Sequence, residues 1–304
     1  KNKGFYAKHT FNDIVYQSSH MERCIHLAKQ AAPSDYTILI RGESGTGKTS
    51  FAVELSKKIY YNTTSLLRYD MSEFSEKQSI SKLIGSPPGY VGHEEGGLLT
   101  EAVRRNPHSI VLFDEIEKAD KDILNILLQI SDYGYLTDSI GRHVNFRNTI
   151  IIMTSNVGAS NLSGNGSVGF VNSKSNDNAI IETLKKHYKE EFINRFDEII
   201  HFKPLNKDTL TQIAKKRLEM IKENAGQKGY TLKFDDGIAE ILAQKSLEKG
   251  MGARPLLREL ANNIENPVAE IMIECAAIKE IYVKMGGNSY VHEIFEEMMK
   301  WDTE

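Results

Sequence analysis

The sequence is poor in cysteine and has no long apolar run. Its two cysteines, Cys24 and Cys275, lie far apart in segments whose patterns predict helices. We expect core thiols of a reducing compartment, the cytoplasm or an organelle, because two cysteines alone complete no metal site. No run reaches the length of a membrane span, and we expect neither a membrane partner nor a signal peptide.

Neither sign of charge is in large excess. Lysine and arginine number 38 against 41 aspartates and glutamates, a formal net charge of −3. Sequence-independent binding of nucleic acid needs a basic face, so we expect no nucleic-acid partner. With 40% apolar and 26% charged residues, the 304-residue chain has ordinary globular composition. It starts at Lys1, so we expect a fragment or a processed form of a longer protein.

The first informative motif is a phosphate-binding loop. Residues 42–49 fit the pattern G-x-x-x-x-G-K-[ST] at every fixed position, and glycines let backbone N–H groups turn inward around an anion. An apolar run at 37–40 precedes the loop and helically spaced apolar residues follow it, which is the required order of strand, loop and helix. The expected nucleotide contacts are Gly42, Glu43, Ser44, Gly45, Thr46, Gly47, Lys48 and Thr49.

The second motif is an acidic strand end. Residues 110–113 form an apolar run typical of a strand buried on both faces, and Asp114 and Glu115 follow directly. Carboxyl ends of parallel strands are where open α/β sheets bind ligands. We expect Lys48 to bind ATP phosphates, Thr49 and Asp114 to hold Mg²⁺, and Glu115 to polarise the attacking water. The alternative for such an acidic pair is a helix N-cap.

Strand and helix patterns alternate as far as Phe202. Strands are predicted near residues 37–41, 66–70, 110–114, 149–154 and 198–202. This alternation predicts an α/β domain with a parallel sheet covered by helices. After Pro204 the apolar spacing becomes mostly helical. One helix is predicted around 210–221, another around 238–242 and a third across 256–268, with short strands near 231–234 and 281–285. We therefore predict a large nucleotide-binding domain over 1–203 and a small, mostly helical domain over 204–304.

Five further segments carry a resemblance to a known family. They are Gly85–Gly92, Leu112–Ala119, Met153–Asn156, Glu191–Asp197 and Gly252–Leu256. In this order they resemble the second ATPase module of the Clp (Hsp100) AAA+ unfoldases, most closely the ClpC type. The resemblance implies a P-loop NTPase fold and a ring, usually hexameric, that hydrolyses ATP to thread protein substrates through its pore.

The resemblance also implies roles for single residues. Asn156 resembles a sensor that orients the attacking water, although a strand-end asparagine also makes ordinary turns. Arg195 resembles the arginine finger that reaches the γ-phosphate of a neighbouring subunit. Its alternative is a surface ion pair with Asp197 or Glu198. Arg254 resembles a second sensor that contacts the phosphates from the helical domain.

Two loops resemble the pore loops of this family. Tyr90 and Val91 lie between Gly89 and Gly92, and an aromatic ring there grips an extended chain without requiring one sequence. The alternative is a tyrosine in an ordinary turn. Residues 135–142 occupy the place of the lower pore loop.

Two departures from the family concern the nucleotide. Glu43 and Thr46 stand where Pro and Val are usual, and residues 11–49 are more similar to enhancer-binding transcription activators, which are also AAA+ ATPases. Ile14 and Val15 replace the usual Ile-Gly pair of the adenine pocket. The Gly-Ala-Phe-Thr-Gly-Ala loop of those activators is missing, and the Clp-type loop stands in its place.

An insert decides between possible functions. Residues 158–178 are rich in Gly, Ser and Asn and predict a long flexible loop. Val168, Gly169 and Phe170 within it resemble the tripeptide that Clp unfoldases dock on a ClpP-type peptidase. Its alternative is an anchor to its own domain. We expect an unfoldase that feeds a peptidase, with a peptidase-independent disaggregase second. A non-hydrolysing assembly module comes last, because Glu115, Asn156 and Arg195 are intact.

Overall fold

The computed structural model describes residues 36–60, 65–86, 89, 96–158, 181–274, 278–286 and 289–296, and the statements below concern these ranges. The chain divides into two compact units at Phe202 and Lys203. The short segment Glu43–Thr46 groups with the second unit. Each unit is described by itself.

The first unit is built on a five-stranded sheet of order β2-β3-β6-β1-β7, in which every pair is parallel. The strands are β1 (Tyr36–Gly42), β2 (Leu66–Asp70), β3 (Ser109–Asp114), β6 (Thr149–Ser155) and β7 (Glu198–Phe202). All five predicted strands are present within about two residues of the expected ends. β3 and β6 are buried at every position, as continuous apolar runs in a parallel sheet should be.

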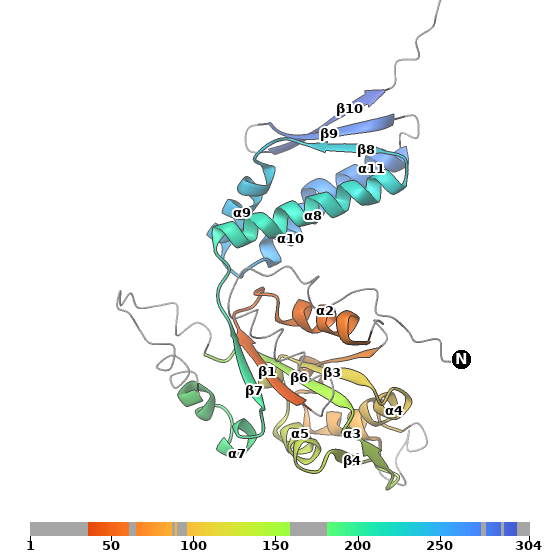
Figure 1. Ribbon diagram of the computed structural model, residues 1–304, viewed down its shortest axis with the longest axis vertical. Helices are drawn as coiled ribbons and strands as arrows, with labels where there is room; N and C mark the ends of the chain where they lie inside the picture. The colour runs from red at the N-terminus through yellow and green to blue at the C-terminus, as the bar shows by residue number, and fades with distance from the viewer. Residues whose placement is uncertain are drawn as a thin grey trace, which may run out of the picture. The chain divides into compact units, whose positions relative to one another are not determined.

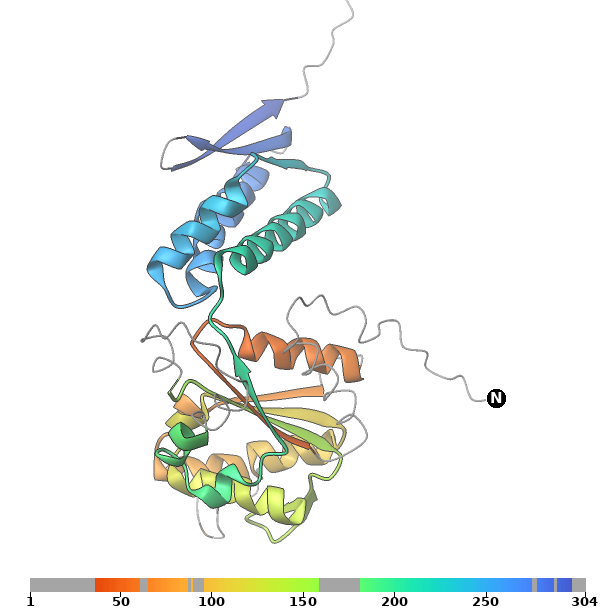
Figure 2. The same cartoon turned by 60° about the vertical axis from the view of Figure 1, so that its left-hand side comes forward.

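Helices cover both faces of this sheet (Figures 1 and 2). The α-helices are α2 (Lys48–Tyr60), α3 (Ile80–Ile84), α4 (Leu98–Arg105), α5 (Lys121–Tyr133) and α7 (Glu190–Ile193). Shorter elements are η3 (Met71–Phe74), η4 (Lys77–Ser79), η6 (Ile116–Lys118), and the hairpin β4 (Tyr135–Thr137) with β5 (His143–Asn145). Alternate strand residues face opposite sides, so Ile38 and Ile152 pack with α2, while Leu39 and Met153 belong to the core under α4 and α5. The α/β fold is confirmed.

The second unit packs helices against a three-stranded sheet of order β10-β9-β8 (Figure 1). The helices are α8 (Lys207–Gln227), α9 (Ile238–Lys249), α10 (Arg254–Leu260) and α11 (Asn266–Glu274), and the strands are β8 (Thr231–Phe234), β9 (Ile278–Gly286) and β10 (Ser289–Glu296). β9 extends beyond its predicted bounds because it pairs with β8 on one side and β10 on the other. β10 was not predicted.

A π-helical stretch, η8 (Ala261–Glu265), joins α10 to α11, where the sequence predicts one continuous helix. Leu256, Leu260, Ile264 and Val268 recur every four residues and are all buried. In a regular α-helix a spacing of four drifts by about 40° at each step. A wider π turn offsets part of this drift, so the four side chains stay in one core.

Candidate active site

The phosphate-binding loop connects β1, an interior strand between β6 and β7, to α2. Gly45 and Gly47 have φ values of +80° and +95°, which L side chains rarely adopt, so the glycines are required for this turn. The first N–H groups of α2 have no helical partner and attract anions. The Lys48 ammonium donates to the Gly42 carbonyl at 2.5 Å and therefore lies back over the loop.

The segment Glu43–Thr46 is held by its own contacts. The Thr46 hydroxyl donates to the Glu43 carbonyl at 2.8 Å. Within the second unit, to which this segment belongs, the Ala253 N–H donates to the Gly45 carbonyl at 3.0 Å. A Cβ on Gly45 would meet the Met251 carbonyl at 2.2 Å, so only glycine fits this close backbone approach.

Asp114, in the acidic strand end, lies beside the phosphate-binding loop. The Thr49 hydroxyl lies 3.1 and 3.0 Å from the two carboxylate oxygens of Asp114, although 65 residues separate them. A hydroxyl and a carboxylate are the oxygen ligands that Mg²⁺ prefers, so these residues fit the expected ion. Among the described residues, no group of three His, Cys, Asp or Glu side chains could hold a metal. An ion here would share its remaining positions with water and phosphate.

Sequence reasoning missed two partners of Asp114. Arg68 on β2 places Nη2 2.7 Å from one carboxylate oxygen, and the Thr154 hydroxyl on β6 donates to the other at 2.5 Å. β2 and β6 flank β3 on its two sides, so both side chains arise from neighbouring strands. The available signal was a polar residue near the carboxyl end of each predicted strand. The strand order, which the sequence did not predict, makes these residues neighbours.

Glu115 has an uncommon backbone conformation. Its φ of +57° places a non-glycine residue in the left-handed region, and such strain clusters at functional sites. Its N–H donates to the Thr154 hydroxyl at 3.0 Å. Its carboxylate pairs with Lys118, and this hydrogen bond raises the pKa of Lys118. The pair with Lys118 uses Oε2 of the Glu115 carboxylate.

Asn156 follows β6 directly and is exposed. Because β1, β3 and β6 are parallel neighbours, Asn156 lies with Gly42 and Asp114 at the carboxyl ends of these strands. The structure therefore brings together the phosphate loop, the acidic strand end and the sensor position.

Arg195 lies at the opposite end of the sheet, near the amino ends of the strands. With Thr37 at the start of β1 and Thr149 at the start of β6, it lines a pocket of about 320 Å³. Its Nε forms an ion pair with Asp132 Oδ1 at 2.6 Å, so the ion pair that the structure shows has a different partner from the expected Asp197 or Glu198. The Asp197 carboxylate instead accepts the Thr37 N–H at 2.7 Å.

The remaining predicted residues lie elsewhere. Arg254 is exposed at the start of α10 in the second unit. Seven others fall outside the described residues: Ile14, Val15, Tyr90, Val91, Val168, Gly169 and Phe170. The lower loop is part of a described hairpin, β4 and β5, whose connection includes Asp138 and Arg142.

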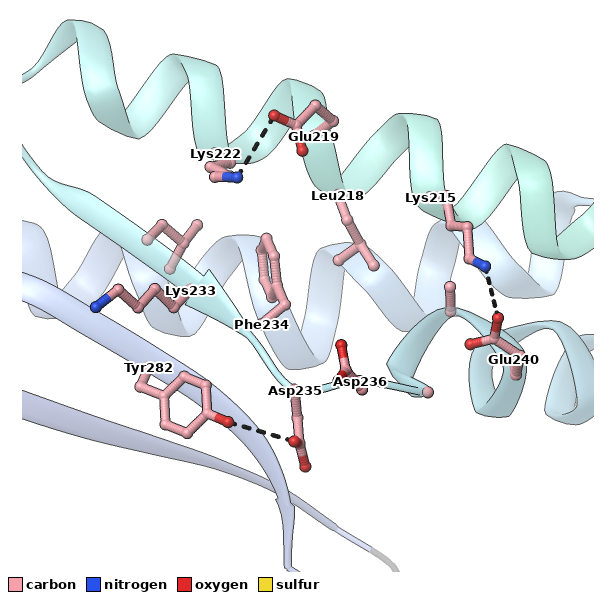
Figure 3. A pocket seen from close by; sticks show the side chains of 13 residues that line it. Lys215, Leu218, Glu219, Lys222, Lys233, Phe234, Asp235, Asp236, Glu240 and Tyr282 are labelled. Carbon is pink, nitrogen blue, oxygen red and sulfur yellow. Dashed lines mark hydrogen bonds and ion pairs between the residues drawn. The ribbon is translucent and has the colours of Figure 1, made fainter.

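The second unit contains a pocket of about 700 Å³ between α8, β8 and the start of α9 (Figure 3). Ion pairs join Lys215 to Glu240 at 2.7 Å and Lys222 to Glu219 at 3.6 Å. The Tyr282 hydroxyl donates to Asp235 at 3.3 Å. These polar groups are directed toward one another, so they form no convergent set for chemistry. The pocket is not the candidate active site.

Comparisons with known proteins agree with this geometry. Residues 34–199 match the family model described as AAA domain (Cdc48 subfamily), and residues 205–283 match the C-terminal, D2-small domain of ClpB protein. None of the described helices is long and apolar enough to cross a membrane.

Similar proteins carry two names. The chain is 41% identical to the chaperone protein ClpB of Vibrio vulnificus (strain YJ016) over 83% of its own length and 29% of that protein. It is 39% identical to the ATP-dependent Clp protease ATP-binding subunit ClpC of Staphylococcus epidermidis over 88% of its length and 34% of that protein. A ClpB of Prochlorococcus marinus is 43% identical over 78% of the chain and 27% of that protein.

The chain thus spans about a third of the length of these relatives. Its resemblance to the Clp family is confirmed, and the relatives include both the ClpB and the ClpC type. Because the AAA model covers more than half of the chain and the small-domain model follows it directly, the chain belongs to the AAA family of nucleotide-binding ATPases and has the domain pair of the Clp (Hsp100) proteins.

Proposed function

We propose that this chain hydrolyses ATP within a ring of subunits, usually six, and uses that energy to unfold protein substrates and thread them through the central pore. The observation that carries the proposal is the distance between Arg195 and the site of its own chain. Asp197 is bonded to Thr37 at the start of β1, whereas the phosphate loop begins at Gly42. Five strand residues span about 16 Å. An arginine that far from its own phosphate loop is better placed to contact a nucleotide bound by a neighbouring subunit than one bound by its own.

The residues at the carboxyl ends of the strands would each have a separate role in ATP hydrolysis. Lys48 and the loop N–H groups would bind the phosphates, and Thr49 and Asp114 would hold Mg²⁺, which when bound neutralises phosphate charge. Glu115 would polarise the attacking water and Asn156 would orient it. Arg254 would report the nucleotide state to the second unit. Ile14 and Val15 would contact the adenine.

Substrate handling is proposed from the sequence and the relatives. Tyr90 and Val91 would contact the threaded polypeptide at the pore. Relatives named as a chaperone and as the ATP-binding subunit of a protease support protein substrates for this chain. Val168, Gly169 and Phe170 favour coupling to a ClpP-type peptidase. The ClpB relatives favour the second candidate, a chaperone that disaggregates proteins without a peptidase.

The first experiment measures ATPase rate against protein concentration, beside a measurement of mass. Activity should rise more than linearly with protein concentration as rings form, because a monomer holds only half of each site. Arg195→Ala should retain ATP binding and lose hydrolysis. Mixed with Glu115→Gln subunits, it should regain activity at interfaces where a Glu115→Gln subunit supplies the arginine. Constant specific activity down to a proven monomer would exclude the ring mechanism.

A second experiment separates the two functions in the full-length protein. Phe170→Ala should abolish peptidase-dependent degradation while ATPase activity and unfolding continue. Tyr90→Ala should retain peptidase binding and stop threading. Degradation by Phe170→Ala at the parent rate would exclude peptidase docking through this residue and favour the chaperone.

A further inference from the structure

The Arg195 guanidinium is held by Asp132. Arg195 follows α7, and its Nε lies 2.6 Å from Asp132 Oδ1 in the last turn of α5. Within the described ranges, Asp132 is the one acidic side chain that pairs with this guanidinium. An arginine has five N–H donors, and a contact at Nε leaves the two terminal amino groups to bind a phosphate with two parallel hydrogen bonds.

The backbone around Arg195 is fixed on both sides. The Asn194 N–H donates to the Glu190 carbonyl at 3.0 Å, and the Arg195 N–H donates to the Phe192 carbonyl at 3.2 Å. Two residues later, the Asp197 N–H donates to the Thr37 carbonyl at 2.9 Å, while its carboxylate accepts the Thr37 N–H. The main freedom left to Arg195 is in its side chain, which Asp132 restrains.

Stability does not explain an aspartate at this place in α5. The carboxyl end of a helix carries partial negative charge, so a carboxylate there is unfavourable. α5 has no basic residue in its last turn to compensate. The side chains of Arg195 and Asp132 are 45% and 24% exposed, and pairs with this degree of exposure contribute little to folding. The ion pair with Arg195 therefore offsets only part of the free-energy cost of placing Asp132 at the end of this helix.

We propose that Asp132 is a positioning residue, which orients the Arg195 guanidinium toward the γ-phosphate bound by the neighbouring subunit. This inference rests on the proposed function, in which Arg195 acts across the subunit interface. Asp132 touches no nucleotide and acts through Arg195 alone. Misplacing a catalytic group by about 1 Å lowers a rate by up to about 100-fold.

The test compares Asp132→Asn with Asp122→Asn in the assembled protein. Both changes remove one carboxylate from α5, but Asp122 lies in the first turn and pairs with Lys77 at 3.8 Å. We expect Asp132→Asn to lower kcat by roughly 10-fold to 100-fold, with an unchanged KM for ATP and an unfolding midpoint equal to or above the parent's. Asp122→Asn should keep the parent kcat. Asp132→Glu should recover part of the loss.

Mixed rings separate this inference from the proposed function. Asp132→Asn subunits mixed with Glu115→Gln subunits should regain activity, because the former keep an intact site and the latter supply a well-placed arginine. Combined with Arg195→Ala, Asp132→Asn should add no further loss. Parent kcat in Asp132→Asn, a fully additive loss, or a midpoint that falls together with the rate would overturn the role of Asp132. If Arg195→Ala itself keeps the parent rate, the proposed function fails, and this inference with it.

Discussion

Charged side chains are used differently in the two units. In the first unit, the Asp114 carboxylate is 8% exposed and lies within hydrogen-bond distance of three neighbouring side chains. In the second unit, Lys215 and Glu240 form an ion pair whose side chains are 62% and 44% exposed. Water and salt weaken an exposed pair but screen a buried charge much less. The first unit therefore holds a buried, multiply bonded carboxylate where its strands end, whereas the Lys215–Glu240 pair of the second unit lies on a solvated surface.

The largest expected effect tests whether the first unit's carboxylates perform the chemistry. Glu115→Gln keeps the shape of the side chain but removes the base, so kcat for ATP hydrolysis should fall by about 100-fold to 10,000-fold while ATP still binds. The matched control is Glu259→Gln in the second unit, where the carboxylate pairs with Lys249 at 3.2 Å and with Lys245 at 3.7 Å. Equal rates for the two variants, measured by phosphate release, would remove the distinction between the units.

Asp138 tests the strength of a buried charge outside the nucleotide site. Its side chain has no exposed area and accepts hydrogen bonds from the Ile140 and Arg142 N–H groups at 3.0 and 2.8 Å and from Arg142 Nε at 2.6 Å. Asp138→Asn should lower the free energy of unfolding by about 1–2 kcal/mol at pH 7, because bonds to an ionised group are stronger.

The same carboxylate predicts a pH dependence. Burial raises the pKa of Asp138, but the hydrogen bonds from Arg142 and Ile140 outweigh burial, and the pKa lies below its ordinary 3.8. A lowered pKa contributes stability that is fully present above the unfolded value and is lost as pH falls through the folded one. The difference in unfolding free energy between the parent and Asp138→Asn should thus disappear below about pH 4. Thermal unfolding measured from pH 7 to 2.5 would show this. A difference that stays constant to pH 2.5 would contradict the buried ion pair.

Arg41 is a buried charge of the first unit whose removal should stabilise the fold. Its side chain is fully buried beside the phosphate loop, and its Nε donates to the Val157 carbonyl at 2.6 Å. Its two terminal amino groups are buried and have no hydrogen-bond partner among the described residues, and burial lowers the pKa of Arg41. Replacing such a group with an apolar one of similar length should stabilise the fold. We expect Arg41→Met to raise the midpoint of thermal unfolding by about 2–4 °C, or about 1 kcal/mol.

The control for this prediction is the same substitution in the second unit. Arg217 is 42% exposed and pairs with Glu265 at 2.8 Å, so Arg217→Met should leave the midpoint equal or slightly lower. If Arg41→Met lowers the midpoint by more than Arg217→Met does, the buried guanidinium is stabilising and the argument from desolvation is wrong.

The smallest effect belongs to the surface of the second unit. Lys215→Met removes an ion pair at the pocket shown in Figure 3, and exposed pairs contribute little. The midpoint should change by less than about 2 °C, with ATPase activity unchanged. Adding 0.5 M salt should leave the variant and the parent equally stable. A larger drop would place this pair among the structural contacts of the unit.

Most of the fold could be predicted from the sequence because its signals are local. The three interior strands of the first unit, β1, β3 and β6, are short and mainly apolar, and burial on both faces of a parallel sheet makes such runs continuous. The helices α8 and α9 follow apolar spacing near 3.6. The π-helical stretch at Ala261–Glu265 was missed, because a spacing of four residues is compatible with an ordinary helix until the core it joins is known.

The candidate site divides in the same way. The phosphate loop and the acidic strand end could be read directly, because each is a continuous segment whose backbone and side chains work together. Thr49 and Asp114 could be expected to meet because Asp114 ends one parallel strand and Thr49 lies just after the loop that follows another. The contacts of Asp114 with Arg68 and Thr154 required the strand order, and that of Arg195 with Asp132 required the packing of α5 beside the segment after α7.

The two local motifs of this protein, a glycine loop of the phosphate-binding type and an acidic strand end, could therefore be recognised in the amino-acid sequence, because neighbouring residues along a chain are constrained by backbone geometry. Which residues support that chemistry was decided only in three dimensions. Sheet order and helix packing bring side chains 40 to 65 positions apart within hydrogen-bond distance. Those contacts arise from burial of apolar surface, which is non-directional and leaves no fixed spacing in the sequence.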